Sequence, residues 1–221
     1  MCIKAFIFDL DGVITDTAEY HFLAWEKTAK ILDIPFDRAF NENLKGVSRM
    51  ESLEKILVNG NKQNDLTYEE KLKLAYDKNQ YYVELIEQIT EKDLLPGIED
   101  LLKELKQKKI KIGLASASKN AITVIQGLKV GKYFDFIADA AICKNSKPAP
   151  DIFLMAAEGL GLEAKYCVGV EDAEAGIEAI KAAKMFSVGV GEPISMRKAD
   201  MIVANTKELS LKKIIENYKL G

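Results

Sequence analysis

The chain has 221 residues and a net charge of −3, with 48% hydrophobic and 29% charged residues. This length suits one large domain or a domain with a smaller insert, and the composition is that of a soluble globular protein. The mild acidity argues against general nucleic-acid binding, and no stretch is long and apolar enough to cross a bilayer. We therefore expect a cytoplasmic protein with neither nucleic acid nor membrane as a partner.

The first predicted strand covers residues 3–10, an apolar run rich in Ile and Phe that leads into Asp9 and Asp11. An Asp-x-Asp-Gly sequence by itself often marks a turn or a calcium loop. The calcium loop is excluded here, because Ile14 and Tyr20 stand where that loop needs a glycine and a bidentate glutamate. The two neighbouring carboxylates therefore need another explanation.

Residues 16–92 differ from the rest of the chain because they contain helical periods and no convincing strand. A capping box of Ser48 and Glu51 predicts the start of one helix, and Pro96 marks the return to the earlier pattern. Helices are predicted at residues 18–32, 49–57 and 68–89. The sequence thus predicts a helical cap at residues 16–92, inserted into a core formed by residues 1–15 and 93–221.

After the return, short apolar runs alternate with helical patterns. Strands are predicted at residues 111–115, 136–138, 166–170, 186–190 and 201–204. Helices are predicted at residues 97–108, 120–128, 150–159 and 173–184. Alternation of this kind predicts an α/β fold with a doubly wound parallel sheet.

Polar side chains follow four of the predicted strands, and ligands of an open parallel sheet bind at the carboxyl ends of its strands. Each polar motif alone has an ordinary structural explanation, such as a turn, small-residue packing or a helix start. All four in this order predict a functional site. The groups concerned are Asp9 with Asp11, the stretch 116–120, Lys147, and the pair Glu171 and Asp172.

The charges of this predicted site favour a metal ion and a phosphate. The carboxylates of Asp9, Glu171 and Asp172 repel one another unless a cation lies between them. Oxygen ligands without a His or Cys partner favour Mg²⁺ over zinc, and Mg²⁺ commonly bridges a carboxylate and a phosphoryl oxygen. Lys147 and Ser116 supply a positive charge and a hydrogen-bond donor for such an anion.

Together, the motifs DLDGVITDT, LKGVSR, ASASKN, SKPAPDIF and VED resemble the haloacid dehalogenase superfamily over nearly the whole chain. The resemblance implies a Rossmann-like core with a helical cap and Mg²⁺-dependent phosphoryl transfer. It implies that Asp9 is the nucleophile that takes the phosphoryl group and that Asp11 is the general acid and base. The implied Mg²⁺ ligands are Asp9, the backbone carbonyl of Asp11, Glu171 and Asp172. The implied groups for the transferring phosphate are Ser116, the amide of Ala117, and Lys147.

The full set of motifs is similar to the mutase branch, which interconverts β-D-glucose 1-phosphate and β-D-glucose 6-phosphate through a phospho-aspartate and glucose 1,6-bisphosphate. A mutase must hold two phosphates and exclude water, and the sequence offers a second anion site where Arg49 and residues 118–120 begin two helices. The resemblance gives catalytic or closure roles to Thr17 and His21 of the cap. It gives substrate-binding roles to Trp25, Leu44, Lys45, Gly46, Val47, Ser48, Arg49, Ser52, Lys78, Ser116, Ala117, Ser118, Lys119 and Asn120.

Two other interpretations stay open on sequence alone. Most relatives with this core hydrolyse phosphate esters, so a sugar-phosphate phosphatase is the nearest alternative, and a non-catalytic sugar-phosphate sensor is another. The sugar and its anomer come from the resemblance and not from the spacing of residues. We expect a monomer that acts on a small sugar phosphate and is primed by glucose 1,6-bisphosphate. The chain departs from the mutase branch at Ala173, where that branch carries a serine.

Overall fold

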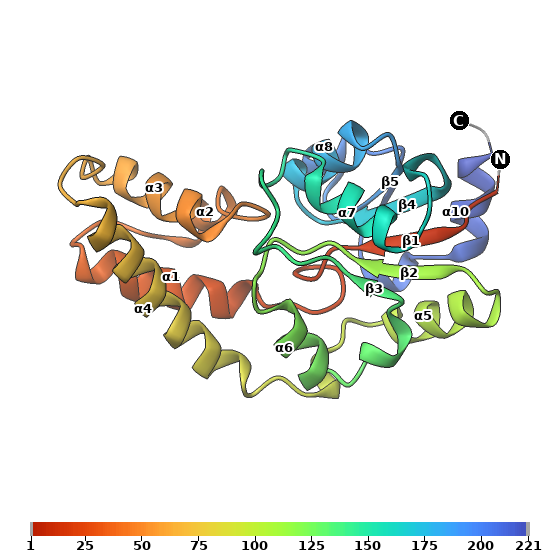
Figure 1. The fold of residues 1–221 in the computed structure, drawn as a ribbon, viewed down its shortest axis with the longest axis horizontal. Coiled ribbons are helices and arrows are strands. Elements are labelled where there is room, and N and C mark those ends of the chain that lie inside the picture. Colours follow the sequence, from red (N-terminus) through yellow and green to blue (C-terminus); the bar gives the residue numbers. More distant parts are fainter. Residues whose placement is uncertain (1, 220–221) are drawn as a thin grey trace.

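A six-stranded parallel sheet organises residues 2–219, the part of the chain that the computed structural model describes (Figure 1). The strand order is β3-β2-β1-β4-β5-β6, and every neighbouring pair is parallel. The strands are β1 (Ala5–Phe8), β2 (Lys111–Leu114), β3 (Phe136–Ile137), β4 (Cys167–Glu171), β5 (Phe186–Val190) and β6 (Met201–Val203). The predicted α/β fold with a doubly wound parallel sheet is confirmed.

Helices cover both faces of the sheet, because the side chains of the central strand alternate between two apolar layers. Phe6 and Phe8 pack in one layer with apolar residues of α5, α6 and α10, whereas Ala5 and Ile7 pack in the other with residues of α7 and α8. Figure 1 shows α7 and α8 on one side of the strands and α5 and α6 on the other. The helices of this part are α5 (Ile98–Gln107), α6 (Ala121–Gly127), α7 (Asp151–Gly159), α8 (Glu174–Ala182), α9 (Pro193–Met196) and α10 (Leu211–Tyr218).

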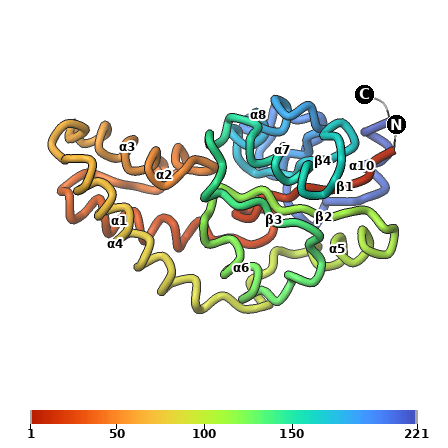
Figure 2. Tube along the Cα trace, viewed as in Figure 1, coloured from red at the N-terminus to blue at the C-terminus, as the bar shows by residue number. Residues whose placement is uncertain are grey.

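Four further helices form a separate group beyond the carboxyl end of β1 (Figures 1 and 2). They are α1 (Ala18–Ile31), α2 (Arg38–Glu42), α3 (Arg49–Asn59) and α4 (Tyr68–Ile86). Their apolar faces share a small cluster of their own, centred on Trp25, Leu53, Ile56 and Leu57. The predicted capping box is present at the start of α3, where Ser48 and Glu51 bond to each other's backbone. None of the described helices combines the length and hydropathy needed to cross a bilayer.

The chain leaves the sheet and returns to it at adjacent points. Thr15 and Leu94 form an isolated antiparallel bridge. The Thr15 hydroxyl donates to the carbonyl of Asp93 at 2.6 Å, and the Leu95 amide donates to the carbonyl of Ile14 at 2.9 Å. The two connections between the helical group and the sheet therefore run side by side.

Candidate active site

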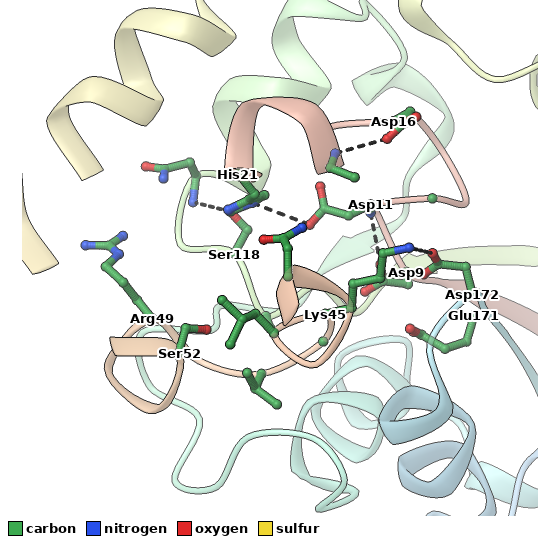
Figure 3. A pocket seen from close by; sticks show the side chains of 18 of the residues that line it. Asp9, Asp11, Asp16, His21, Lys45, Arg49, Ser52, Ser118, Glu171 and Asp172 are labelled. Atoms are coloured by element: carbon green, nitrogen blue, oxygen red, sulfur yellow. Dashed lines mark hydrogen bonds and ion pairs between the residues drawn. The ribbon is translucent and has the colours of Figure 1, made fainter. Parts of the chain in front are cut away.

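A cavity of about 450 Å³ lies between the carboxyl ends of the strands and helices α1, α3 and α4. Figure 3 shows acidic side chains from the strand ends on one side of it and Arg49 and Ser52 on another. Most of the predicted site residues line it: Asp9, Asp11, His21, Trp25, Leu44, Lys45, Gly46, Val47, Ser48, Arg49, Ser52, Lys78, Ala117, Ser118, Lys119, Asn120, Glu171 and Asp172. The other predicted residues, Thr17, Ser116 and Lys147, are buried in the wall beneath these.

Three carboxylates meet at the floor of the cavity. Asp9, Glu171 and Asp172 each offer one oxygen, and these atoms lie within 4.8 Å of one another. Asp9 follows β1, and Glu171 ends the neighbouring β4, so that the sheet pairing itself brings the acids together. A cluster of hard oxygen donors in this arrangement fits Mg²⁺.

Lys147 is the fully buried counter-charge of this cluster. Its ammonium group lies 2.6 Å from Asp9 and 2.9 Å from Glu171, and its side chain is fully buried. Burial alone lowers the pKa of Lys147, but the two carboxylates outweigh that effect and raise it, so that the lysine stays charged. The Lys147-Pro148 peptide bond is cis.

Lys147, together with Lys45 at 3.9 Å from Asp172, does not fully offset the three acids, and the pKa values of Glu171 and Asp172 reflect the remaining repulsion. Burial, followed by the charge of Asp9, raises the pKa of Asp172 to about 7. The same two causes raise the pKa of Glu171 well above its usual value, against the opposing effect of Lys147. A divalent cation bound among these oxygens would stabilise the ionised forms.

Asp11 lies beside the carboxylate cluster in a different environment. Its backbone amide donates to Asp9 at 2.9 Å, while its carboxylate turns toward the helical group and accepts a hydrogen bond from the Thr17 hydroxyl. About 31% of its side chain is exposed, and Asp11 is among the residues that line the cavity. Burial and the charge of Asp9 raise the pKa of Asp11 to about 7. A carboxyl group with this pKa can both give and take a proton near neutrality.

The opposite wall of the cavity holds two basic groups, the buried Lys78 and the half-buried His21. The Lys78 ammonium group lies 3.0 Å from the Nδ1 atom of His21, and the Nε2 atom of His21 lies 4.0 Å from Asp11. Burial and the charges of Lys78 and Arg49 hold the pKa of His21 well below its usual value. Burial and Arg49 also lower the pKa of Lys78 to about 7. His21 is therefore neutral at neutral pH, whereas Lys78 gains and loses its proton near pH 7.

Arg49 and Asn120 meet at a residue that the sequence did not reveal. Asn79 accepts hydrogen bonds from the guanidinium of Arg49 at 2.6 Å and from the side-chain amide of Asn120 at 2.8 Å. Tyr82 was also missed, and its ring stacks on His21 with 4.1 Å between centroids. A signal was present, because Lys78 and Tyr82 are four residues apart and so share one face of α4.

Comparison with known protein families shows the family to which this chain belongs. Residues 3–184 match the haloacid dehalogenase-like hydrolase family. The chain belongs to this family. The predicted Asp-x-Asp motif, lysine and acidic pair all fall within the matched residues.

Individual members of the haloacid dehalogenase-like family are similar over nearly the whole length. A curated β-phosphoglucomutase of Bacillus subtilis is 52% identical, with 98% of this chain and 96% of the relative covered. A crystal structure of β-phosphoglucomutase from Clostridium difficile superposes with a TM-score of 0.97 at 56% identity, covering 99% of this chain and 98% of that one. A phosphorylated carbohydrates phosphatase of Thermotoga maritima is 31% identical over 82% of each chain.

At Ala173 the chain departs from the mutase branch, which carries a serine there. The backbone of Ala173 still contacts the acidic pair of Glu171 and Asp172 through Glu171. Its amide donates to Glu171 at 3.2 Å. No side chain caps α8 at this residue, which is 7% exposed. The backbone thus retains one contact that orients Glu171, and a serine hydroxyl is not available to add another.

Proposed function

We propose that the protein is a Mg²⁺-dependent β-phosphoglucomutase that interconverts β-D-glucose 1-phosphate and β-D-glucose 6-phosphate. The observation that carries this proposal is a pair of anion-binding groups on opposite sides of one cavity. Lys147 lies 2.6 Å from Asp9, and Ser116 follows β2, the strand that pairs with β1. Arg49 lies across the cavity from Asp9 (Figure 3), and it shares the acceptor Asn79 with Asn120. A phosphatase needs the first group only. The similarity to the two β-phosphoglucomutases supports the same choice.

Asp9 is the proposed nucleophile. One of its oxygens forms a bond to the phosphorus of glucose 1,6-bisphosphate, and the bond between that phosphorus and the sugar oxygen breaks. Lys147 holds the charge of Asp9 before transfer and that of the phosphoryl oxygens during it. Ser116 and the amide of Ala117 complete the proposed contacts with this phosphoryl group.

Asp11 is the proposed general acid and base. When the sugar oxygen leaves phosphorus, Asp11 donates the proton that this oxygen needs. In the reverse direction it removes the proton of the attacking hydroxyl, while the bond between phosphorus and Asp9 breaks. Its pKa of about 7 suits both tasks, and Thr17 orients it through their hydrogen bond.

The proposed Mg²⁺ ligands are Asp9, the backbone carbonyl of Asp11, Glu171 and Asp172, of which three contribute the clustered side-chain oxygens. When bound, Mg²⁺ supplies positive charge that offsets the transferring phosphoryl group. Glucose 1,6-bisphosphate is the proposed priming donor, because a free Asp9 must first gain a phosphoryl group.

Residues 16–92 are the proposed cap, and residues 1–15 and 93–221 the proposed core. Closure of the cap excludes water, so that the sugar and not water accepts the phosphoryl group. His21 and Lys78 would support Asp11 from the cap side. The proposed sugar contacts are Trp25, Leu44, Lys45, Gly46, Val47, Ser48, Ser52 and Lys78, and the proposed contacts with the second phosphate are Arg49, Ser118, Lys119 and Asn120. Since one chain supplies all of these groups, we propose that the protein is a monomer. We also propose that it is cytoplasmic.

A sugar-phosphate phosphatase is the second candidate, favoured by the similarity to the Thermotoga maritima enzyme. One assay separates the two. Each anomer of glucose 1-phosphate is supplied with and without glucose 1,6-bisphosphate, while glucose 6-phosphate and inorganic phosphate are measured together. The mutase converts the β anomer after priming and releases almost no phosphate. Stoichiometric release of phosphate from either anomer would refute the proposal.

A further inference from the structure

Two helices of the cap begin with the same capping box, but only one of the boxes reaches the core. In α3, Glu51 accepts from the amide of Ser48 at 3.1 Å and from its hydroxyl at 2.8 Å. In α4, Glu70 accepts from the amide and hydroxyl of Thr67 at 2.8 and 2.9 Å. Glu51 also accepts a hydrogen bond from the hydroxyl of Ser146. Glu70 has no such third donor among the described residues.

The additional contact joins two segments that carry charged groups of the site. Ser146 is 95 positions from Glu51 in the sequence and immediately precedes Lys147. Glu51 lies in the first turn of α3, two residues after Arg49. One carboxylate therefore links the helix start that carries Arg49 to the loop that carries Lys147.

Neither partner of this contact lines the cavity. Two other polar contacts between cap and core, Asn79 with Asn120 at 2.8 Å and Lys45 with Asp172 at 3.9 Å, use residues that face the cavity. A ligand can replace either of them. The contact between Glu51 and Ser146 leaves the cavity free, and a ligand inside does not compete for it.

We infer that Glu51 and Ser146 are positioning residues that hold the cap closed and thereby fix Arg49 relative to Lys147. This inference rests on the proposed mutase function, because a mutase needs the two phosphate sites at a set separation. A contact made only when the cap is closed shifts the equilibrium toward closure. Water then reaches the phosphoryl group on Asp9 less often.

The protonation of Glu51 agrees with this role. Partial burial by itself raises the pKa of Glu51, but hydrogen bonds from Ser146 and Ser48 and the charge of Lys55 together lower it. The carboxylate is thus ionised, and its bond with Ser146 is charge-assisted. Glu51 is exposed to solvent, which limits the strength of the bond. We expect its loss to raise the open fraction about threefold to tenfold.

The variants that test this are Ser146→Ala, Glu51→Gln and the double variant. Glutamine can keep the capping box, so Glu51→Gln removes the charge without removing the helix start. Ser146→Thr retains a hydroxyl and serves as the rescue. Glu70→Gln is the matched control, because it makes the same change in a box that does not reach the core.

Two measurements are made on each full-length variant. The first is the inorganic phosphate released per glucose 6-phosphate formed, which we expect to rise about threefold to tenfold in both single variants. The double variant should match Ser146→Ala, because that variant already removes the contact that Glu51→Gln weakens. Ser146→Thr and Glu70→Gln should behave as wild type. An unchanged ratio in Ser146→Ala, or an equal rise in Glu70→Gln, would overturn the inference.

The second measurement is the radius of gyration of the ligand-free protein by small-angle X-ray scattering, which does not depend on the reaction catalysed. A larger radius in Ser146→Ala and Glu51→Gln than in wild type and Glu70→Gln supports the contact as a closure device. An equal radius in all four refutes it. If the protein proves to be a phosphatase, the scattering result still stands, so that failure of the proposed function and failure of this inference are distinguishable.

Discussion

The ammonium group of Lys147 lies 2.6 Å from an oxygen of Asp9, with 0% and 7% of the two side chains exposed to solvent. The same ammonium group lies 2.9 Å from Glu171. A buried ion pair is costly to break from one side, because the partner is left as an uncompensated charge. Here two partners depend on the same lysine, so its removal affects both the chemistry and the fold.

We expect Lys147→Met to reduce turnover by at least about 100-fold, since the phosphoryl group loses a preorganised positive charge. It should also lower the free energy of unfolding in EDTA by about 3 kcal/mol at pH 8, as for other broken buried pairs. At pH 6 the loss should be smaller, because the raised pKa of Glu171 lets this carboxyl take up a proton. Urea unfolding at the two pH values measures this. Lys144→Met, an exposed change in the same loop, should alter neither quantity.

Asp172→Asn should change the stability of the metal-free protein with pH. The pKa of Asp172 is raised from 3.8 to about 7, so the folded state binds the proton more tightly than the unfolded state. The contribution of Asp172 to the stability of the folded protein is therefore favourable below about pH 4 and is lost as pH rises through 7. In EDTA, the variant should be more stable than wild type by about 4 kcal/mol at pH 8 and indistinguishable from it at pH 4.

Mg²⁺ should reverse that order at pH 8. Wild type gains stability by binding the ion, whereas the variant lacks one carboxylate ligand and gains less. Melting temperatures with and without Mg²⁺ measure both effects. If wild type shows no Mg²⁺-dependent gain, the acidic cluster is not a magnesium site.

Asn79→Ala should weaken the proposed second phosphate site, because Arg49 and Asn120 both lose their shared acceptor. At about 0.5–1.5 kcal/mol for each of the two hydrogen bonds, the KM for glucose 1,6-bisphosphate should rise about fivefold to 150-fold. Formation of the phosphoenzyme at saturating donor should change less. Steady-state kinetics measures the KM, and a phosphoenzyme assay at saturating glucose 1,6-bisphosphate measures formation of the phosphoenzyme. Gln80→Ala, the exposed neighbour on the same helix, is the control, and an equal rise in its KM contradicts the prediction.

Gly176→Ala should displace a proposed metal ligand without unfolding the protein. A methyl group at this position in α8 would lie 2.0 Å from the carboxyl carbon of Glu171, so that side chain must move away from the cluster. We expect Mg²⁺ affinity to fall about tenfold to 100-fold by calorimetric titration. Gly131→Ala is the control, because its added methyl group would lie 3.6 Å from the nearest atom, on Ile125. This variant should leave Mg²⁺ affinity unchanged. Equal affinities in the two variants would show that Glu171 does not bind the ion.

The parts of the molecule that the sequence predicted are those set by local patterns. Alternating apolar runs and helical periods identified the parallel sheet, and polar residues after the predicted strands identified Asp9, Lys147 and Asp172. The pairing of β1 with β4 brings Asp9 and Asp172 together. Strand lengths were less certain. The run at residues 3–10 contains only the four residues of β1, because the chain turns away after Asp9.

The missed features depend on how the helical group sits against the sheet. Asn79 and Ser146 belong to polar stretches whose local pattern indicates solvated helix or loop, and their partners are 30 or more positions away. Helices α2, α9 and α10 were also missed. They have five, four and eight residues, too few for a helical period to stand out.

Thr15 and Leu94 pair directly where the inserted helices begin and end. The sheet keeps its strand order whatever is spliced between these two positions, since neither β1 nor β2 has to move to admit it. Evolution can then lengthen or replace the inserted helices, or change their side chains, while the residues at the strand ends stay unchanged. New substrates become accessible in this architecture by replacing a single contiguous piece of the gene.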